Sequence, residues 1–390
     1  MKVKWLIVGA GFSGCVMAER IASQLDESVL IIEKRNHIGG NSYDHYDEHG
    51  VLVHRYGPHI FHTNSQVVWD YLSQFTDWHL YYHRVLGMIH GKQVPIPFNL
   101  NSIEALFPAH LAEKLERALV EQFGFGSKVP ILKLREKAGG ELTFLADFIY
   151  ENVFKGYTEK QWGFRPEELG SGVTGRVPVS VSRDDRYFQD VYQAMPKHGY
   201  TAMFERMLAH KNIKLLLNAD FKELEGEVQY DRMIFTGPMD HYFGYAFGRL
   251  PYRSLRFHHE HHQIETFQSV GTINYPNEHA FTRISEYKTM TGQRCYGTSV
   301  TTEFPEAFVE GQNDPYYPIP KAENHDMYRR YLEEAKQLGD SVIFLGRLAD
   351  YKYYNMDQAV ARALVIFEQR IANRKMAANP QVSTELEMRI

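Results

Sequence analysis

The first 33 residues change from apolar to mixed and back to apolar, in the order expected of a strand, a helix and a second strand. Residues 5–8 are wholly apolar and precede three closely spaced glycines, Gly9, Gly11 and Gly14. Residues 15–25 then carry apolar side chains at helical spacing, and the segment SVLIIE (28–33) is a short apolar strand that ends in an acid. This order predicts a β-α-β unit with parallel strands.

The rest of the chain divides by the period of its apolar positions. Residues 100–165 have helical periodicity, whereas 241–334 are rich in β-favouring residues and turns. Short apolar strands return at 212–238, and a strand, a turn and an amphipathic helix from about Met356 follow. We predict an α/β fold in which a discontinuous Rossmann-like domain is interrupted by a helical lobe and an antiparallel β-sheet lobe. The predicted ranges are 1–80, 195–240 and 335–373 for the Rossmann-like domain, 100–165 for the helical lobe, 81–99, 170–194 and 241–334 for the sheet lobe, and 374–390 for a polar tail.

The glycine spacing after the first strand is a nucleotide-binding pattern. In G-x-G-x-x-G the first glycine permits a tight turn, the second lets a pyrophosphate approach the backbone, and the third lets the helix pack on the strand. The N-terminus of the helix then supplies amide donors to the phosphates. Glu33 lies 19 residues after Gly14, where an acid can bond a ribose hydroxyl. A dinucleotide site is therefore predicted.

A glycine pair, Gly39 and Gly40, indicates which dinucleotide binds. An acid, a short basic stretch and GGN resemble the extended fingerprint of FAD-binding proteins related to amine oxidases. In those proteins a second glycine-rich turn continues the cradle toward the ribityl chain. We therefore predict FAD, and the alternative is a plain surface turn.

A second G-x-G-x-x-G match, GSGVTG (170–175), lacks the required context. It follows RPEEL rather than an apolar strand and runs into the β-favouring segment RVPVSV. We predict a flexible loop that opens no helix and no second nucleotide site.

Composition narrows the class of protein. A formal charge of −5 over 390 residues gives no reason to expect nucleic acid or an acidic membrane surface as a partner. The two cysteines, Cys15 and Cys295, provide no disulfide framework, so a reducing, cytoplasmic setting is expected. No run approaches the roughly 18 apolar residues of a spanning helix, so no integral membrane segment is predicted.

A histidine-rich segment, FHHEHHQ (257–263), invites a metal interpretation. No accompanying pattern supplies a defined coordination geometry, so a solvated hairpin is the favoured interpretation. His59 and His62, at three-residue spacing, likewise lack a third ligand, and no metal is predicted.

Motifs along residues 1 to about 370 together resemble bacterial UDP-galactopyranose mutases. The resemblance rests on GPHIFHT (57–63), KGYTEKQWG (155–163), TGRVPV (174–179), FTRISEY (281–287), YYPIP (316–320) and GRLADYKYYNMD (346–357). It implies interconversion of UDP-galactopyranose and UDP-galactofuranose on reduced FAD, through a covalent adduct of the sugar with flavin N5 and with no net redox change. It also implies a homodimer.

The resemblance implies a role for arginines and tyrosines at the substrate diphosphate. Arg176 and Arg283 match the two diphosphate arginines, and planar guanidinium groups suit that task. Arg176 directly follows the glycine-rich loop, which is expected to close over the substrate. Tyr317 and Tyr353 match tyrosines that bond the same diphosphate. From its position alone, Arg176 would be interpreted as a solvated surface arginine. Likewise, a tyrosine chosen without the family match is more often a packing residue.

The resemblance also assigns the uridine and flavin contacts. Tyr157 and Trp162 match the uridine pair, although an aromatic residue on an amphipathic helix is usually core. His62 is expected beside the flavin and, with Arg176 and Arg283, forms the predicted catalytic set. Further predicted substrate contacts are Phe154, Thr158, Asn274, His83 and Asn355. The predicted cofactor contacts are Gly9, Gly11, Phe12, Ser13, Gly14, Glu33, Lys34, Gly40, Asn41, His59, Ile60, Gly346, Arg347, Tyr354, Asn355 and Met356.

Two positions depart from the pattern of other members. Asn355 stands where others carry aspartate, and His83 where others carry asparagine, which changes local hydrogen bonding but predicts no change of reaction. An FAD-dependent oxidoreductase of the amine oxidase or desaturase type is the main alternative. A binding protein like the GDP-dissociation inhibitors is another. The two arginines and paired tyrosines argue against the first, and Glu33 with GGN argues against the second.

Overall fold

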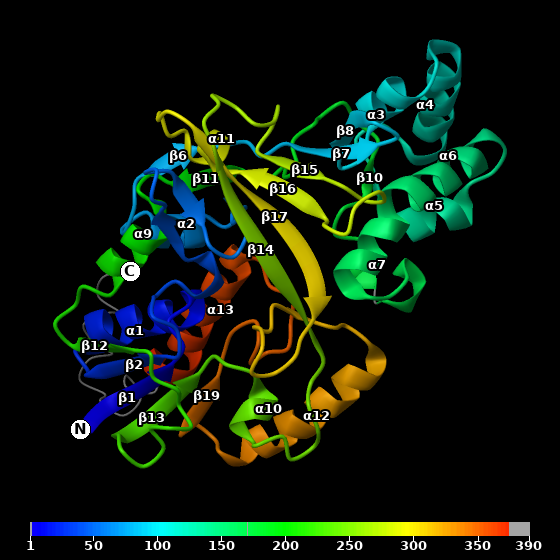
Figure 1. The fold of residues 1–390 in the computed structure, drawn as a ribbon. Coiled ribbons are helices and arrows are strands. Elements are labelled where there is room, and N and C mark those ends of the chain that lie inside the picture. Colours follow the sequence, from blue (N-terminus) through cyan, green and yellow to red (C-terminus); the bar gives the residue numbers. More distant parts are fainter. Residues whose placement is uncertain (1, 170, 374–390) are drawn as a thin grey trace, which may run out of the picture.

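A parallel sheet of five strands lies at the base of the molecule (Figure 1). The computed structural model describes residues 2–169 and 171–373. The sheet has the order β12 (Ile213–Leu217), β2 (Val29–Glu33), β1 (Lys2–Val8), β13 (Gln229–Phe235) and β19 (Val342–Phe344). The apolar strands predicted near the N-terminus and at 212–238 form this sheet. Strand β2 is buried along its length, whereas the edge strand β12 exposes Leu215 and Leu216.

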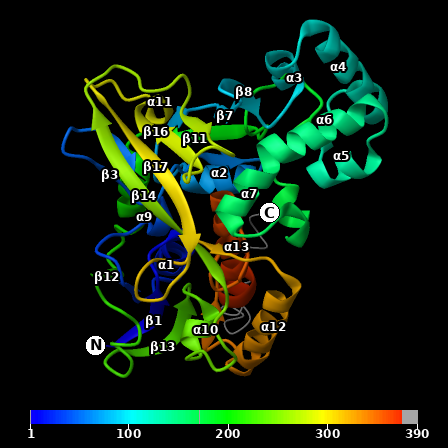
Figure 2. The same cartoon turned by 45° about the vertical axis from the view of Figure 1, so that its right-hand side comes forward.

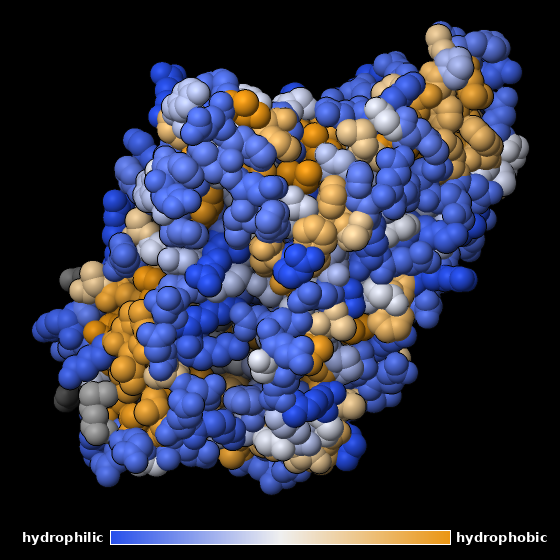
Figure 3. Space-filling view, in the orientation of Figure 1, coloured by the Kyte–Doolittle hydropathy of each residue, from blue (hydrophilic) through white to orange (hydrophobic). Residues whose placement is uncertain are grey.

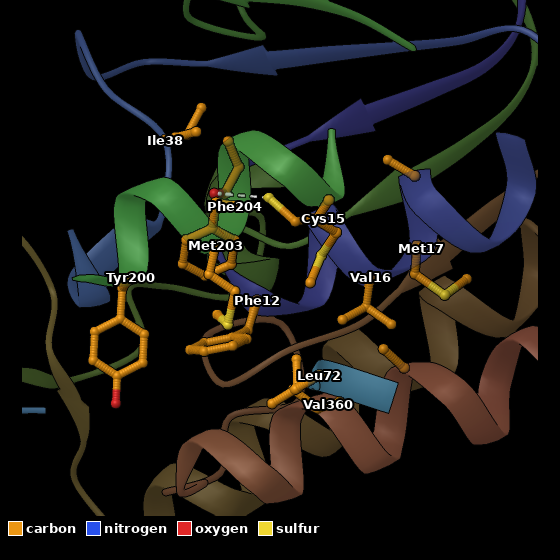
Figure 4. Packing of buried hydrophobic residues seen from close by; sticks show 14 of the residues in the cluster. Phe12, Cys15, Val16, Met17, Ile38, Leu72, Tyr200, Met203, Phe204 and Val360 are labelled. Atoms are coloured by element: carbon orange, nitrogen blue, oxygen red, sulfur yellow. Dashed lines mark hydrogen bonds between the residues drawn. The ribbon is translucent and has the colours of Figure 1, made fainter. Parts of the chain in front are cut away.

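Helix α1 (Phe12–Leu25) fixes one face of this sheet. Its buried residues pack on α9 (Gly199–Met207) and α13 (Met356–Phe367), and the ring of Phe12 meets the edge of Phe204 at 4.8 Å. Figure 4 shows this packing, in which the thiol of Cys15 donates to the carbonyl of Ala10 at 3.2 Å. The helix starts after a three-residue turn that follows β1, and three residues earlier than the sequence pattern predicts.

A second sheet of seven strands crosses above the first (Figure 1). Its order is β18 (Tyr317–Pro318), β14 (Tyr252–His262), β17 (Thr298–Ala307), β16 (Arg283–Glu286), β15 (Thr272–Asn274), β7 (Val85–Ile89) and β8 (Lys92–Ile96). All neighbouring strands are antiparallel except β15 and β7, which are parallel, so the sheet is mixed. This sheet carries Arg283, Asn274 and Tyr317 above the end of the parallel sheet.

The helical lobe projects away from both sheets, as Figures 1 and 2 show. It contains α3 (Leu100–Leu106), α4 (Ala109–Phe123), α5 (Ile131–Lys137), α6 (Glu141–Ile149), the π-helix η2 (Tyr150–Lys155) and α7 (Gly156–Trp162). These elements enclose their own apolar core together with the β9–β10 pair, Lys128–Val129 and Val179–Ser180. Figure 3 shows apolar surface gathered on this lobe, where Phe125 and Phe144 are exposed.

The remaining elements connect these three parts. Helix α12 (Ala322–Gln337) extends across the boundary predicted at 334 and packs against α10 (Met239–Tyr242). The other elements are η1 (Gly40–Ser42), β3 (Asp44–Tyr46), β4 (Leu52–His54), β5 (Phe61–Thr63), α2 (Gln66–Leu72), β6 (Trp78–Leu80), η3 (Pro166–Glu168), α8 (Ser171–Thr174), β11 (Tyr192–Pro196), α11 (Tyr287–Thr291) and η4 (Glu368–Ala372).

Two local predictions were wrong. The segment predicted as a loop at 170–175 contains the short helix α8, and the histidine-rich segment is the end of strand β14 rather than a hairpin. Strand β14 pairs residue by residue with β17 as far as His262, and its consecutive polar residues 258–260 are exposed. The predicted tail, 374–390, lies outside the described residues.

Replacing Gly14 by alanine should destabilise the fold. A Cβ at Gly14 would lie 2.0 Å from the carbonyl oxygen of Gly9, so α1 would have to move off β1. We expect Gly14→Ala to lower the free energy of unfolding, measured by urea denaturation, by about 1–3 kcal/mol. Gly139→Ala, where a Cβ meets nothing within 4 Å, is the control. Equal stability of the two variants would show that a Cβ at Gly14 does not clash with the carbonyl oxygen of Gly9.

Candidate functional site

Four glycines form a cradle at the carboxyl end of the parallel sheet. Gly9 has a positive φ of 101°, and Gly11 approaches Gly40 so closely that a Cβ on Gly40 would lie 3.0 Å from the Gly11 Cα. A Cβ on Gly346 would lie 3.0 Å from the hydroxyl of Ser13. Gly11 caps α1 without a side-chain hydrogen bond, so the first amides of the helix face this cradle. The cradle suits a pyrophosphate.

Glu33 closes the cradle at the end of β2. Its carboxylate is buried and accepts hydrogen bonds from the backbone amides of Ala10 (2.9 Å) and Arg35 (3.0 Å). These two bonds fix both oxygens, and each oxygen keeps a lone pair that can accept a ribose hydroxyl.

A cavity of about 1080 Å³ extends from this cradle to the second sheet. It is lined by residues of the Rossmann-like domain, of the seven-stranded sheet, and of the segment 176–190. The predicted site residues that line it are Gly9, Gly11, Phe12, Ser13, Glu33, Lys34, Gly40, Asn41, His59, Ile60, His62, His83, Tyr157, Arg176, Asn274, Arg283, Tyr317, Gly346, Arg347, Tyr353, Tyr354, Asn355 and Met356.

Four predicted residues do not line the cavity. Gly14 is buried in the first turn of α1 against β1, Phe154 packs in the core of the helical lobe, and Thr158 is buried on α7. Trp162 lies behind the tyrosines, with ring centroids 5.9 Å from Tyr317 and 5.8 Å from Tyr353. In this conformation, Trp162 supports the tyrosine pair rather than the cavity surface.

Arg283 is held by a buried ion pair. Its Nε and Nη2 both donate to the carboxylate of Glu303 at 2.9 Å, and Glu303 is 1% exposed. Burial alone would lower the pKa of Arg283, but the adjacent carboxylate raises that pKa well above its usual value. The guanidinium is therefore charged and fixed in orientation, with Nη1 outside this bidentate pair.

Arg176 has neutral partners instead. Its Nη1 donates to the carbonyl of Tyr353 at 3.1 Å, and its Nη2 donates to the side-chain oxygen of Asn355. The guanidinium carbon lies 3.9 Å from the centroid of the Tyr353 ring. Tyr353 and Tyr317 meet edge to face at 5.0 Å, and the Arg347 guanidinium lies over Tyr317. Two tyrosines thus join three arginines around one part of the cavity.

His62 is fixed by a carboxylate and an aromatic ring. Its Nδ1 lies 3.0 Å from Asp190 Oδ2, and its ring stacks on Phe188 at 3.6 Å. Asp190 also accepts from the side-chain amide of Asn64 at 2.7 Å. A carboxylate at Nδ1 favours the tautomer that carries its proton there, which leaves Nε2 as an acceptor.

Two other histidines of the cavity are neutral at neutral pH. Burial lowers the pKa of His59 to about 3, and the ring bonds the carbonyl of Gly57. Burial, together with the charge of Arg283, lowers the pKa of His83 to about 3. His83 contacts the hydroxyl of Tyr81 at 3.1 Å. Both rings can accept or donate one hydrogen bond without adding charge.

Sequence reasoning missed several residues of this site. Arg35, Asp190 and Asp314 line the cavity, and Glu303 anchors Arg283. Arg35 bonds both Asn41 and Asp314, which lie on different parts of the chain. Only the position of Arg35, two residues after the acid Glu33, offered a signal in the sequence.

The residues present fit a bound nucleotide cofactor and a polar ligand. The side-chain oxygen of Asn274 lines the cavity and is buried without a hydrogen-bond partner among the described residues. Side chains larger than glycine would place Cβ atoms in the space where a pyrophosphate would lie. Glu33 lies at the position where a ribose hydroxyl would bind. Within 2–169 and 171–373, no cluster of three or more His, Cys, Asp or Glu side chains could hold a metal ion. In the same ranges, no helix combines the length and apolar character needed to cross a membrane.

Comparison with known proteins gives consistent matches. A family model described as UDP-galactopyranose mutase matches residues 152–353, and an NAD(P)-binding Rossmann-like domain model matches residues 7–75. A Klebsiella pneumoniae protein named "Probable UDP-galactopyranose mutase" is 39% identical over 92% of both chains. An Escherichia coli dTDP-fucopyranose mutase is 34% identical, over 95% of this chain and 99% of that protein. A crystal structure of a reduced UDP-galactopyranose mutase superposes with a TM-score of 0.72 at 16% identity, covering 97% of both chains.

Replacing Glu303 by glutamine should strongly destabilise the protein. Glutamine keeps the shape but leaves the partly buried Arg283 charge without its counterion. We expect Glu303→Gln to lower the free energy of unfolding by about 3–5 kcal/mol in chemical denaturation. Glu333→Gln breaks the exposed pair with Lys336 and should cost less than about 1 kcal/mol. Similar losses in both variants would show that the Arg283–Glu303 pair is not the anchor described.

Proposed function

The chain belongs to the UDP-galactopyranose mutase family, and we propose that it interconverts UDP-galactopyranose and UDP-galactofuranose with FAD as its cofactor. It is an isomerase, as the curated members are. The observation that carries the proposal is one continuous cavity with a nucleotide cradle at one end and three arginines with two tyrosines at the other. Amine oxidases such as a putrescine oxidase share the fold, with a TM-score of 0.59, at only 12% identity.

The cofactor would occupy the cradle described above. Gly9, Gly11 and the first turn of α1 would hold its pyrophosphate, and Glu33 its adenosine ribose. Reduced FAD would supply the nucleophile that attacks the anomeric carbon, so that the sugar ring can open and close with no net oxidation. His59, Ile60 and Met356 are the residues we propose to contact the flavin. The protein's own part is to bind, orient and exclude water.

The arginines would bind and then stabilise the UDP leaving group. Arg283 is pre-oriented by Glu303, and Arg176 and Arg347 lie near the paired tyrosines. Guanidinium groups make charge-assisted bonds with phosphate oxygens, each worth about 1.5–3 kcal/mol. The hydroxyls of Tyr317 and Tyr353 would donate to the same diphosphate. We propose Tyr157 and Trp162, with Phe154 and Thr158 nearby, as the uracil contacts, although reaching uracil requires Trp162 to become exposed.

His62 would move the proton that ring exchange requires. Converting the pyranose to the furanose breaks the bond from C1 to O5 and forms the bond from C1 to O4. One proton therefore leaves O4 and one is added at O5, with no net change. The Nε2 of His62 is a suitable acceptor and donor, because Asp190 holds the other ring nitrogen. Asn274, His83 and Asn355 would bond the remaining sugar and phosphate groups.

A second candidate substrate is dTDP-fucopyranose. The family relative that acts on it is 34% identical across 99% of its length. Fucose lacks the 6-hydroxyl of galactose, so the two substrates differ by one hydroxyl on the sugar and by the nucleoside. We also propose that the protein forms a homodimer. We propose a reducing, cytoplasmic setting, which the two free thiols of Cys15 and Cys295 support.

The proposal is tested by anaerobic turnover. The FAD-loaded protein is mixed with UDP-galactofuranose, with and without dithionite, and the nucleotide sugars are separated by chromatography. We expect UDP-galactopyranose only under reducing conditions, because only the reduced flavin is nucleophilic. A parallel reaction with the dTDP-fucose pair decides between the substrates. No conversion of either pair with bound, reduced FAD would refute the proposal.

Asp190→Asn should slow catalysis without weakening substrate binding. Asparagine keeps the size of the side chain but no longer favours a proton on Nδ1 of His62, so the tautomer that presents Nε2 as an acceptor is lost. We expect kcat to fall about 10²- to 10⁴-fold, the range that general acid–base catalysis contributes, with KM nearly unchanged. The 15N chemical shifts of the His62 ring report the tautomer directly. Unchanged shifts and an unchanged kcat would contradict the assignment.

A further inference from the structure

The cavity continues past Glu33 into a compartment that the chemistry does not use. A cofactor with its pyrophosphate at α1 and its ribose at Glu33 must place its adenine beyond that acid. The residues lining this end include Lys34, Ala219, Asp220 and Phe221, which follow strands β2 and β12. This inference rests on the proposed FAD cofactor.

Two loops line this compartment and emerge side by side. The register of the second sheet pairs Arg253 with Ala307, so the residues before β14 and those after β17 lie next to each other. Tyr245 and Arg249 come from the first loop and Glu310 from the second, and all three line the cavity. Figure 1 shows both loops near the lower ends of β14 and β17.

Three side chains link the two loops. The hydroxyl of Tyr245 donates to Glu310 Oε1, and Arg249 forms an ion pair with Glu310 Oε2. The Arg249 guanidinium also lies 4.0 Å from the centroid of the Tyr245 ring. We call Tyr245, Arg249 and Glu310 the clasp. It is exposed on its outer side, where the side chains of Arg249 and Glu310 are 57% and 40% exposed.

The backbone of Tyr245 is strained. Its φ is +62°, a left-handed conformation that costs a bulky residue of order 1 kcal/mol. The Tyr245 amide donates to the carbonyl of Asp240 at 2.8 Å, which holds the residue in this conformation. This strained residue lines the cavity and makes the contact with Glu310.

A buried acceptor in the same compartment indicates a ligand. Asp240 is 3% exposed and lines the cavity, and its Oδ2 accepts from the amide of Leu250 at 2.8 Å. Its Oδ1 is buried and has no hydrogen-bond partner among the described residues. An unpaired buried carboxylate oxygen is costly unless a donor reaches it. The exocyclic amino group of adenine is such a donor.

We propose that the clasp closes over the adenine end of bound FAD and controls how fast the cofactor leaves. FAD can leave only after Glu310 separates from Tyr245 and Arg249, because both loops line the compartment that holds the adenine. Exposed pairs of this kind are individually weak, so the clasp slows release rather than preventing it.

The test measures FAD dissociation from the holoenzyme. Holoenzyme is diluted into an excess of a flavin-capturing apoprotein, and loss of bound FAD is followed by fluorescence. We expect Glu310→Ala, which removes both contacts of the clasp, to raise the dissociation rate about 3- to 10-fold. Tyr245→Phe should produce a smaller increase, because it removes one hydrogen bond only. Glu333→Ala, at the exposed pair with Lys336, is the control and should match the wild type.

The outcomes separate this inference from the proposed function. Equal dissociation rates for wild type and Glu310→Ala overturn the clasp, whether or not the enzyme turns over UDP-sugars. If Glu310→Ala releases FAD faster but its apoprotein also has a lower Tm, the substitution has destabilised the whole fold, and the clasp is again overturned. Faster release with an unchanged apoprotein Tm, in an enzyme without mutase activity, supports the clasp and refutes the proposed reaction. A protein that binds no FAD overturns both.

Discussion

The close approach of three backbone segments at the end of β1 is the constraint on which the site depends. Gly14 lies on the carbonyl of Gly9, and Gly11 lies against Gly40, with no space for a side chain at Gly14 or Gly40. Because α1 is held this close, its first amides lie directly beyond the strand. The first turn of α1, the turn at Gly39–Gly40 and Glu33 therefore meet at one point, and the cavity begins there.

The other end of the cavity is fixed by a different kind of interaction. Arg283 and Glu303 come from neighbouring antiparallel strands, β16 and β17, and form a buried bidentate pair. Such a pair is costly to bury, and its contribution to overall stability is small or negative compared with an apolar pair. Its consequence is geometric: one charged group is held in one orientation. The segments between the two ends, including Arg176 and the His62–Asp190 pair, are positioned by side-chain contacts across distant parts of the chain.

The sequence predicted the features that depend on residues close together in the chain, and it missed those that depend on residues far apart. The glycine fingerprint, Glu33 and most strands depend on spacings of a few residues, and the structure has them where the pattern placed them. The start of α1 was misplaced because its glycines resemble a loop, although Gly14 is helical and buried. The partners Glu303, Asp190 and Asp314 lie 20, 128 and 279 positions from Arg283, His62 and Arg35. Strand register and lobe packing determine these pairs, and no local pattern contains that information. The strand at 257–262 was missed because its consecutive polar residues lack the apolar–polar alternation of a half-buried strand, although it pairs with β17 along its length.

Arg283 and Arg176, the two arginines proposed to bind the diphosphate, have different partners, which bears on how the cavity would take up a dianion. Arg283 keeps a buried carboxylate as its partner, so a phosphate can only add to that arrangement. Arg176 contacts a carbonyl and an amide oxygen, both neutral. Both bonds are already charge-assisted, but a phosphate oxygen also carries negative charge and therefore attracts the guanidinium more strongly than a neutral oxygen does. Arg176 would therefore bond a phosphate oxygen in preference to the side-chain oxygen of Asn355. An aspartate at position 355 would instead compete with the phosphate for Arg176. Asn355 also caps α13, so Arg176 can leave without the helix losing its cap. The neutral residue at 355 thus lets Arg176 switch partners while the scaffold around it stays in place.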